Sequence, residues 1–278
     1  MVVAKDLMDS ELITIEVPNK RSIVLELMEK KGIRAIPVVK KGTKTLVGIV
    51  SMKDLLKNPS EGDLGMLMRR DLITVSPNSS LNQIKKLILK HKIRRFPVVE
   101  ESNNEVLGML SVRNIISKAI SVMKIKDPIK NYIIRNFTTV WEDTPLPVIP
   151  HIMKLANVSI IPVIDREGKL TGMISNEEMV KNGEIISENS KSTSGTEEHD
   201  WSWDVTSTQL ITYRKLKLPE VPVKEIMVKK LITTVENFSI PDCAKKMKKH
   251  NINQMPVLDA NNKLLGIITD VALIKVLK

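Results

Sequence analysis

Four short apolar runs, each interrupted by a proline, recur along the chain, and each is followed by a second run that begins at a glycine. These landmarks are Pro37 and Gly48, Pro97 and Gly108, Pro162 and Gly172, and Pro256 and Gly266. Apolar, β-branched runs bounded by turn residues predict strands, and a proline inside such a run favours an edge strand or the start of a strand. The pattern therefore predicts four copies of one structural unit.

A helical pattern precedes each proline run, and a shorter helix is predicted after each glycine run. In the second copy, residues 72–75 predict a strand, and apolar side chains follow at helical spacing over residues 81–88. One position just past this helix is occupied in the four copies by Gly32, Lys92, Asn157 and Asn251. Gly and Asn tolerate the left-handed conformation that ends a helix. Ser51 and Ser111 precede the shorter helix and are predicted to cap it.

The order of elements predicts an α+β fold, in which each copy is β-α-β-β-α after a short leading helix. The predicted copies are residues 1–59, 60–120, 121–182 and 223–278. A unit of roughly 55–60 residues is marginal alone, so the first copy is expected to pair with the second, and the third with the fourth.

The prolines are 60, 65 and 94 residues apart, which places an insert at 183–222. Residues 188–198 are polar and predict a flexible loop. Trp201 and Trp203 follow, and we expect them to dock on the protein's own surface rather than on a partner. Periodicity does not distinguish a helix from a strand at 210–218.

Composition indicates a globular chain. Apolar residues make up 42% of it, and no apolar run reaches the ~18 residues of a membrane helix. The first residues lack the features of a secretory signal, and the single cysteine, Cys243, favours a reducing compartment. A cytoplasmic protein without a membrane partner is therefore expected.

The net charge of +11 lies mainly in the first half of the chain. Residues 1–118 carry 21 Lys or Arg and 13 Asp or Glu, whereas residues 119–278 carry 22 and 19. An anionic partner is therefore expected at the first half, either a small phosphate ligand or nucleic acid. Aromatic residues make up only 3%, which disfavours stacking on single-stranded bases.

The repeated element, a Pro-Val strand followed by Gly-h-h-[Ser/Thr]-x-x-[Asp/Asn] (h, apolar), resembles the CBS domain over nearly the whole chain. In this family two repeats pair into a Bateman module. Four repeats resemble the gamma subunit of AMP-activated protein kinase and archaeal stand-alone CBS proteins. The resemblance implies that an adenine nucleotide, AMP, ADP or ATP, binds between paired repeats.

The resemblance also implies roles for individual residues of the first pair. The ribose residues would be Ser51, Asp54, Ser111 and Asn114. The phosphate residues would be Arg34, Lys53, Arg94, Arg95 and Arg113. The adenine would lie against Thr14, Ile15, Ile36, Pro37, Thr74, Val75, Phe96 and Pro97. Arginines suit a phosphate because they form forked, charge-assisted hydrogen bonds.

The second pair departs from this pattern. Its secondary candidates are Ser175, Glu178 and Thr269, but Ala272 stands at the ribose position of the fourth copy and no cation precedes either proline. We therefore expect residues 1–118 to bind the nucleotide. The alternative is that the five cations of the first pair are only solvated surface charges.

The function predicted from these observations is a non-catalytic nucleotide sensor for energy status. No phosphate loop, paired-carboxylate motif or Cys/His cluster indicates an enzyme, a catalytic cofactor or a metal site. The alternatives are an S-adenosylmethionine-binding protein, which the arginines disfavour, a nucleic-acid-binding module and a ligand-free scaffold. A homodimer through the CBS modules and an unidentified protein partner are further expectations from the family.

Overall fold

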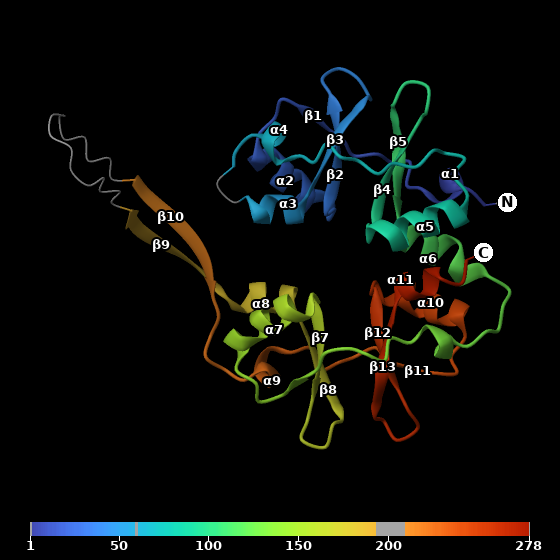
Figure 1. Ribbon diagram of the computed structural model, residues 1–278, viewed down its shortest axis with the longest axis vertical. Helices are drawn as coiled ribbons and strands as arrows, with labels where there is room; N and C mark the ends of the chain where they lie inside the picture. Colours follow the sequence, from blue (N-terminus) through green and yellow to red (C-terminus); the bar gives the residue numbers. More distant parts are fainter. Residues whose placement is uncertain (1, 59–60, 193–208, 278) are drawn as a thin grey trace, which may run out of the picture. The chain divides into compact units, whose positions relative to one another are not determined.

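The computed structural model describes residues 2–58, 61–192 and 209–277, and its elements are labelled in Figure 1. The chain divides into two compact units. The first unit contains Met1–Ile134, Glu236–Met255 and Ile267–Lys278, and the second contains Arg135–Val235 and Pro256–Gly266. Among the described residues, no helix has both the length and the apolar character needed to cross a membrane.

The first two copies lie in the first unit and follow the predicted order. The first copy contains α1 (Ala4–Leu7), β1 (Ile15–Val17), α2 (Arg21–Lys31), β2 (Ala35–Lys40), β3 (Leu46–Ser51) and α3 (Met52–Lys57). The second copy contains α4 (Leu64–Leu67), α5 (Leu81–His91), β4 (Arg95–Val99), β5 (Val106–Ser111) and α6 (Val112–Lys118), followed by the 3₁₀ turn η1 (Ile120–Val122). The strand predicted at 72–75 is reduced to one bridge between Val75 and Val98.

The third and fourth copies repeat this order. The third contains η2 (Ile129–Tyr132), β6 (Val140–Trp141), η3 (Leu146–Val148), α7 (Ile149–Ala156), β7 (Ile160–Ile164), β8 (Leu170–Ser175) and α8 (Asn176–Asn182). The fourth contains α9 (Val223–Ile226), β11 (Thr234–Val235), α10 (Ile240–His250), β12 (Gln254–Leu258), β13 (Leu264–Thr269) and α11 (Asp270–Ile274). The predicted α+β fold of four repeats is confirmed.

Three of the four prolines lie in a middle strand, which corrects the expected edge or starting position for them, whereas Pro97 lies in β4 of the two-stranded sheet β4-β5. Three sheets have the orders β1-β2-β3, β6-β7-β8 and β11-β12-β13, with the proline strand in the centre. Pro37 faces Ile49 across the β2–β3 pair. The N–H and the carbonyl of Ile49 both bond instead to Arg69, at 3.0 and 2.9 Å. Because this pair of positions exchanges no hydrogen bond, proline removes none from the β2–β3 pair, and on its other side β1 pairs with β2 only from Val38 onward.

The predicted helix ends and caps are confirmed. Gly32, Lys92, Asn157 and Asn251 have φ of 61°, 54°, 53° and 56°, the left-handed conformation expected of them. Ser51 and Ser111 cap α3 and α6.

Within each pair, the leading segment of one copy, which is its short first helix and the residues just after it, packs on the other copy. Arg69 of the second copy bridges Ile49 of the first, and Asp9 of the first bridges Met109 of the second. A Cβ added to Gly108 would lie 2.7 Å from both the Asp9 carbonyl oxygen and the Met8 sulfur. The repeated glycine therefore makes room for the exchanged segment.

The second pair exchanges its leading segments in the same way. Ile134 bonds to Ile267 in the first unit, and Val228 bonds to Met173 in the second unit. Gly172 is overlain by Met227, whose sulfur would lie 2.2 Å from an added Cβ.

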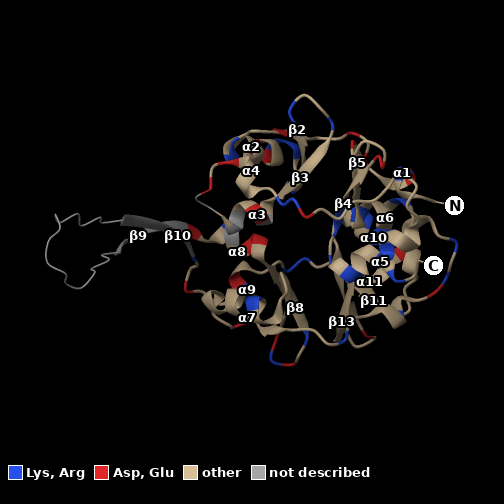
Figure 2. Ribbon diagram, turned by 45° about the horizontal axis from the view of Figure 1, so that its top comes forward, with Lys and Arg blue, Asp and Glu red and all other residues tan. Residues whose placement is uncertain are grey.

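The hairpins of the first pair also meet directly. Val39, Leu46, Val99 and Val106 form a shared apolar cluster, and the Leu46 N–H donates to the Asn104 carbonyl at 3.0 Å. On the other side of the second copy, α6 and η1 pack against α10 and α11 of the fourth copy, also within the first unit. Lysines extend along α5 and α10 (Figure 2).

The insert contains an antiparallel ribbon. β9 (Glu184–Ser192) pairs with β10 (Gln209–Lys217) from Glu184 opposite Lys217 to Ser192 opposite Gln209. Residues 188–192, predicted as loop, are therefore strand, because cross-strand hydrogen bonds organise a polar segment that has no core of its own. Residues 210–217 are also strand. Trp201, Trp203 and the remainder of the predicted loop lie outside the described residues.

Candidate functional site

The ribose candidates of the first copy form a closed cap at the start of α3. The Asp54 carboxylate accepts the Ser51 N–H at 2.9 Å and also the Ser51 hydroxyl. Arg69, from the exchanged segment of the second copy, places its Nε 3.2 Å from Asp54 Oδ1. The Asp54 side chain is 12% exposed and that of Arg69 is 53% exposed. The carboxylate is thus held in place, with an exposed cation beside it.

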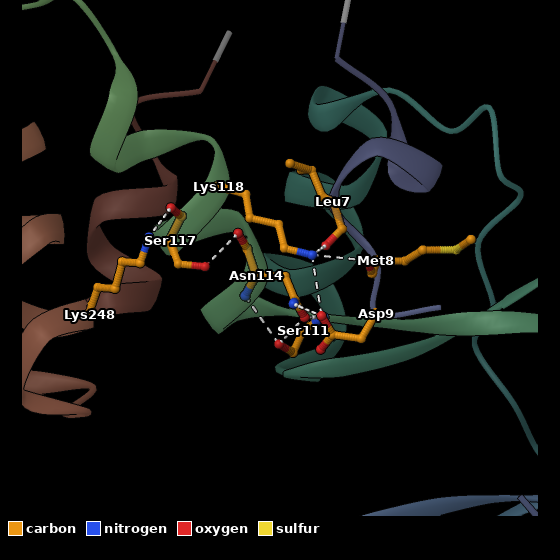
Figure 3. A network of polar contacts seen from close by, with 8 residues as sticks. All are labelled: Leu7, Met8, Asp9, Ser111, Asn114, Ser117, Lys118 and Lys248. Atoms are coloured by element: carbon orange, nitrogen blue, oxygen red, sulfur yellow. Dashed lines mark hydrogen bonds and ion pairs between the residues drawn. The ribbon is translucent and has the colours of Figure 1, made fainter. Parts of the chain in front are cut away.

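The second copy has a matching but chemically different cap (Figure 3). Asn114 Oδ1 accepts the Ser111 N–H at 2.9 Å, and Asn114 Nδ2 donates to Asp9 Oδ1 at 2.9 Å. Lys118 Nζ donates to the carbonyls of Leu7 and Met8 and to Asp9 Oδ1, the last at 3.2 Å. Asp9 of the first copy thus lies beside the cap of the second copy, just as Arg69 of the second copy lies beside the cap of the first.

The two pairs differ in the type of residue that follows the short leading helix. It is Asp9 or Arg69 in the first pair, where it contacts Asn114 or Asp54. In the second pair the equivalent residues are Ile134 and Val228, which are apolar. Polar ribose candidates thus coincide with a charged neighbour from the exchanged segment. Sequence reasoning missed Asp9 and Arg69, although both directly follow a methionine that closes a leading helix, Met8 or Met68.

The residue three positions before each proline forms a backbone hydrogen bond with the first residue of the helix that follows the strand pair. The Arg34 carbonyl accepts the Met52 N–H at 3.1 Å, and the Arg94 carbonyl accepts the Val112 N–H at 3.0 Å. In the second pair the same bonds join Asn176 to Ser159 and Asp270 to Asn253. The arginines therefore stand beside the ribose candidates because of the backbone geometry of the repeat.

Three of the other phosphate candidates lie close enough to Arg95 to affect it. Desolvation first, and then the positive charges of Arg94, Arg34 and Arg113, lower the pKa of Arg95. Arg95 is an exposed residue at the start of β4. We call Arg34, Arg94, Arg95 and Arg113 the arginine cluster. The Lys53 side chain lies outside the described residues.

Asp270, at the start of α11, is an acidic residue that contacts the arginine cluster, and sequence reasoning missed it. Its carboxylate pairs with Arg94 Nη2 through Oδ2 and accepts the Val271 N–H at 2.7 Å through Oδ1. Its side chain is 5% exposed. Burial raises the pKa of Asp270, and this outweighs the opposing effects of Arg94, the Val271 N–H and Arg113. The two residues are 176 positions apart, so no local pattern could have joined them.

The adenine candidates differ in how far they are exposed. Ile36 and Phe96 have no exposed surface and fill the core, so in this structure they offer no face to a base. Ile15, Pro37, Val75 and Pro97 are also buried, whereas Thr14 and Thr74 are partly exposed. Contacts of these residues with a base stay predictions.

The secondary candidates of the second pair act as helix caps. Glu178 accepts the Ser175 N–H at 3.1 Å and the Ser175 hydroxyl. Thr269 Oγ1 accepts the Ala272 N–H at 3.1 Å. Neither cap has a cation of the arginine cluster's kind before its proline.

Neither a metal site nor a reactive cysteine is indicated among the described residues. No group of three or more His, Cys, Asp or Glu side chains there is arranged to hold a metal ion. Cys243 is fully buried in α10, and burial raises the pKa of its thiol to about 12. A thiol of this kind is a poor nucleophile near neutral pH.

Similarity to known proteins agrees with the repeat structure. The CBS domain profile matches residues 4–61, 62–121, 129–183 and 223–278. A conserved uncharacterised protein from Pyrococcus horikoshii has a crystal structure with a TM-score of 0.71 to this chain, at 28% identity and over 99% of each chain.

Two proteins of Methanocaldococcus jannaschii are also similar. The crystal structure of MJ1225, proposed as an archaeal homologue of γ-AMPK, has a TM-score of 0.71 at 19% identity over 99% of each chain. MJ1426 is 30% identical over 170 residues, which are 56% of this chain and 92% of that protein. With four matched domains that span most of its length, the chain belongs to the CBS domain family.

Proposed function

We propose that this protein is a non-catalytic, cytoplasmic regulatory protein that binds an adenine nucleotide, AMP, ADP or ATP, at its first pair of CBS domains. The observation that carries the proposal is the arginine cluster. Burial first, and then the charges of three other guanidinium groups from two repeats, lower the pKa of Arg95. Like charges gathered in this way repel one another, and a bound phosphate would relieve the repulsion.

The ribose candidates support the same location. Asp54 and Asn114 are held at helix starts by Ser51 and Ser111, and backbone bonds place Arg34 and Arg94 beside those starts. A nucleotide with its sugar at a cap and its phosphate at the cluster would contact both. The second pair has Ala272 in place of one ribose candidate and no cation before its prolines, so the proposal assigns it no phosphate site.

A regulatory role follows if the ligand binds two arrangements of the paired repeats with different affinity. The exchanged segments supply a route, because Asp9 and Arg69 join each ribose candidate to the other repeat of the pair. A protein partner or a second copy of the chain would then read the change.

Calorimetric titration of the full chain with AMP and with ATP, at two salt concentrations, tests the proposal. The test variant is Arg95→Ala, because burial and the charges of Arg94, Arg34 and Arg113 together lower the pKa of this arginine. We expect it to weaken binding at least about tenfold, since a charge-assisted bond to phosphate is lost. Lys169→Ala is the control, because it removes an exposed cation that pairs only with Glu167 among the described carboxylates.

The result also separates the alternatives. Equal affinity in Arg95→Ala and the parent protein would remove the phosphate site. Binding of S-adenosylmethionine but of neither nucleotide would replace the proposed ligand. Tight binding of nucleic acid that falls steeply with salt and is not displaced by ATP would replace the proposed function.

A further inference from the structure

We propose that Asp270 is an internal counter-ion of the arginine cluster, which a ligand phosphate displaces from Arg94. Asp270 would thereby determine how strongly negative a ligand must be in order to bind. The inference rests on the proposed function for the identity of the ligand, but not for the displacement itself.

The geometry places the carboxylate where an anion would compete for the same donor. Asp270 Oδ2 is bonded to Arg94 Nη2, a nitrogen of the forked guanidinium face that carboxylates and phosphates share. The Arg94 side chain is 42% exposed, whereas that of Asp270 is 5% exposed. An anion from solvent therefore has access to the arginine and would meet Asp270 as the group already bound to it.

The charges in this region favour exchange. Asp270 pairs with Arg94 and also feels the positive charge of Arg113. Neither Arg95 nor Arg113 forms an ion pair in the part of the chain that the structure describes. A phosphate carries more negative charge than a carboxylate and has more acceptor oxygens. Because one Asp cannot neutralise Arg94, Arg95 and Arg113 together, a multiply charged ligand gains contacts that Asp270 leaves unmade.

The environment of Asp270 also limits how tightly it holds Arg94. Burial disfavours its charged form more than its partners favour it, which is the direction of its pKa change. Buried ion pairs of this kind add little net stability, because desolvation cancels much of the attraction. Displacement by a ligand is therefore not opposed by a strong internal bond.

Displacement would reach the fourth repeat directly. Asp270 is the first residue of α11, and its N–H donates to the Asn253 carbonyl at 2.9 Å. The C-terminal end of the chain is tied to the second repeat by Lys85 Nζ, which donates to the Leu277 carbonyl. Both contacts lie within the first unit. A ligand on Arg94 would thus loosen one of the ties between α11 and the second repeat.

The experiment compares the full-length protein with Asp270→Asn, using tripolyphosphate and AMP as calorimetric probes. Asparagine keeps an oxygen for the Val271 N–H but removes the negative charge. We expect both probes to bind at least about tenfold more tightly to the variant, since the competing charge is gone. Asp242→Asn is the matched control, because it removes a carboxylate from the first turn of α10 that pairs with Lys245.

Asp270→Ser provides a second neutral variant if the asparagine variant does not fold. Tighter tripolyphosphate binding without AMP binding would uphold displacement and overturn the nucleotide proposal. Equal AMP affinity in the parent and both variants would overturn displacement and leave the nucleotide proposal standing. Weaker binding in the variants would also overturn displacement. If neither probe binds any of the proteins, both proposals fail.

Discussion

Arg69 of the second repeat places its Nε 3.2 Å from the Asp54 carboxylate of the first repeat. The contact exists because the segment after α4 crosses to the first repeat and bonds to both backbone groups of Ile49. Asp9 makes the equivalent crossing in the other direction and contacts Asn114. The candidate site of the first pair is therefore built by two repeats at each of its caps.

The Arg69–Asp54 pair should contribute modestly to stability. A double-mutant cycle with Arg69→Met and Asp54→Asn is expected to give a coupling free energy of about 0.2–1 kcal/mol, because the arginine is half exposed and screened by water. Urea unfolding at low and high salt measures it, and the coupling should shrink at high salt. A coupling that does not change with salt would mean that the two residues interact through packing instead.

Gly108→Ala should destabilise the protein. The added Cβ would lie 2.7 Å from the Asp9 carbonyl oxygen, so the exchanged segment must shift. A loss of about 1–3 kcal/mol in the free energy of unfolding is expected for such overpacking. Gly62→Ala is the control, because nothing lies within 4 Å of its added Cβ. Equal stability of the two variants would show that the segment is not held against β5.

Lys92→Gly should stabilise the protein. Lys92 ends α5 with a φ of 54°, a conformation that glycine adopts without steric cost. Relief of the left-handed strain, less the extra freedom that glycine adds to the unfolded chain, gives an expected gain of about 0.5–1 kcal/mol, measured by thermal or urea unfolding. Lys90→Gly, inside the same helix, should instead lose about 1 kcal/mol. A loss in both variants would contradict the left-handed conformation at residue 92.

The pH dependence of Asp270→Asn should reveal the buried carboxyl. Because the folded-state pKa of Asp270 is raised above its ordinary value of 3.8, the folded protein binds this proton more readily than the unfolded chain. The contribution of Asp270 to the stability of the parent protein should therefore fall as pH rises through the unfolded and then the folded pKa. The stability of Asp270→Asn relative to the parent should increase over the same range.

Asp242 provides the opposite case for the same measurement. Lys245 and Ser239 lower its pKa, so its stabilising contribution is present above the unfolded pKa and is lost as pH falls through the folded pKa. The measurement is urea unfolding of the parent, Asp270→Asn and Asp242→Asn between pH 3 and pH 7. A pH profile of Asp270→Asn parallel to that of the parent would contradict the raised pKa.

The Cys243 thiol should resist alkylation in the folded protein. It is fully buried, and its pKa is raised to about 12, so little thiolate forms at pH 8. We expect reaction with a thiol reagent only after unfolding in urea, followed by absorbance. Rapid reaction of the folded protein would show that α10 opens readily.

Much of the repeat could be predicted from local sequence, because the responsible interactions are local. A left-handed residue after each long helix follows from Gly32, Asn157 and Asn251, and the caps follow from Ser51 and Ser111. The proline position was predicted wrongly for a non-local reason. Pro37 tolerates a middle strand because it exchanges no hydrogen bond with Ile49, and because β1 pairs with β2 only from Val38 onward.

The candidate site shows the same division. The residues before the prolines and after the glycines were identified by their place in a repeated motif, which fixes Arg34, Arg94, Asp54 and Asn114. Their partners were not identified, because Asp9 is 105 positions from Asn114 and Asp270 is 176 positions from Arg94. Contacts at such separations depend on how repeats pack, which no spacing within one repeat records.

The sequence alone determined the four repeats, their helix ends, the α+β order of elements and the concentration of cations in the first half. Those features arise from backbone preferences and from side-chain periodicity over a few residues. Only the tertiary structure decided which charged groups face one another. In the folded chain the leading segments are exchanged between repeats, the arginines lie near one another, and a buried carboxylate of the fourth repeat contacts the second. These contacts depend on burial and charge, which are properties of the packed chain.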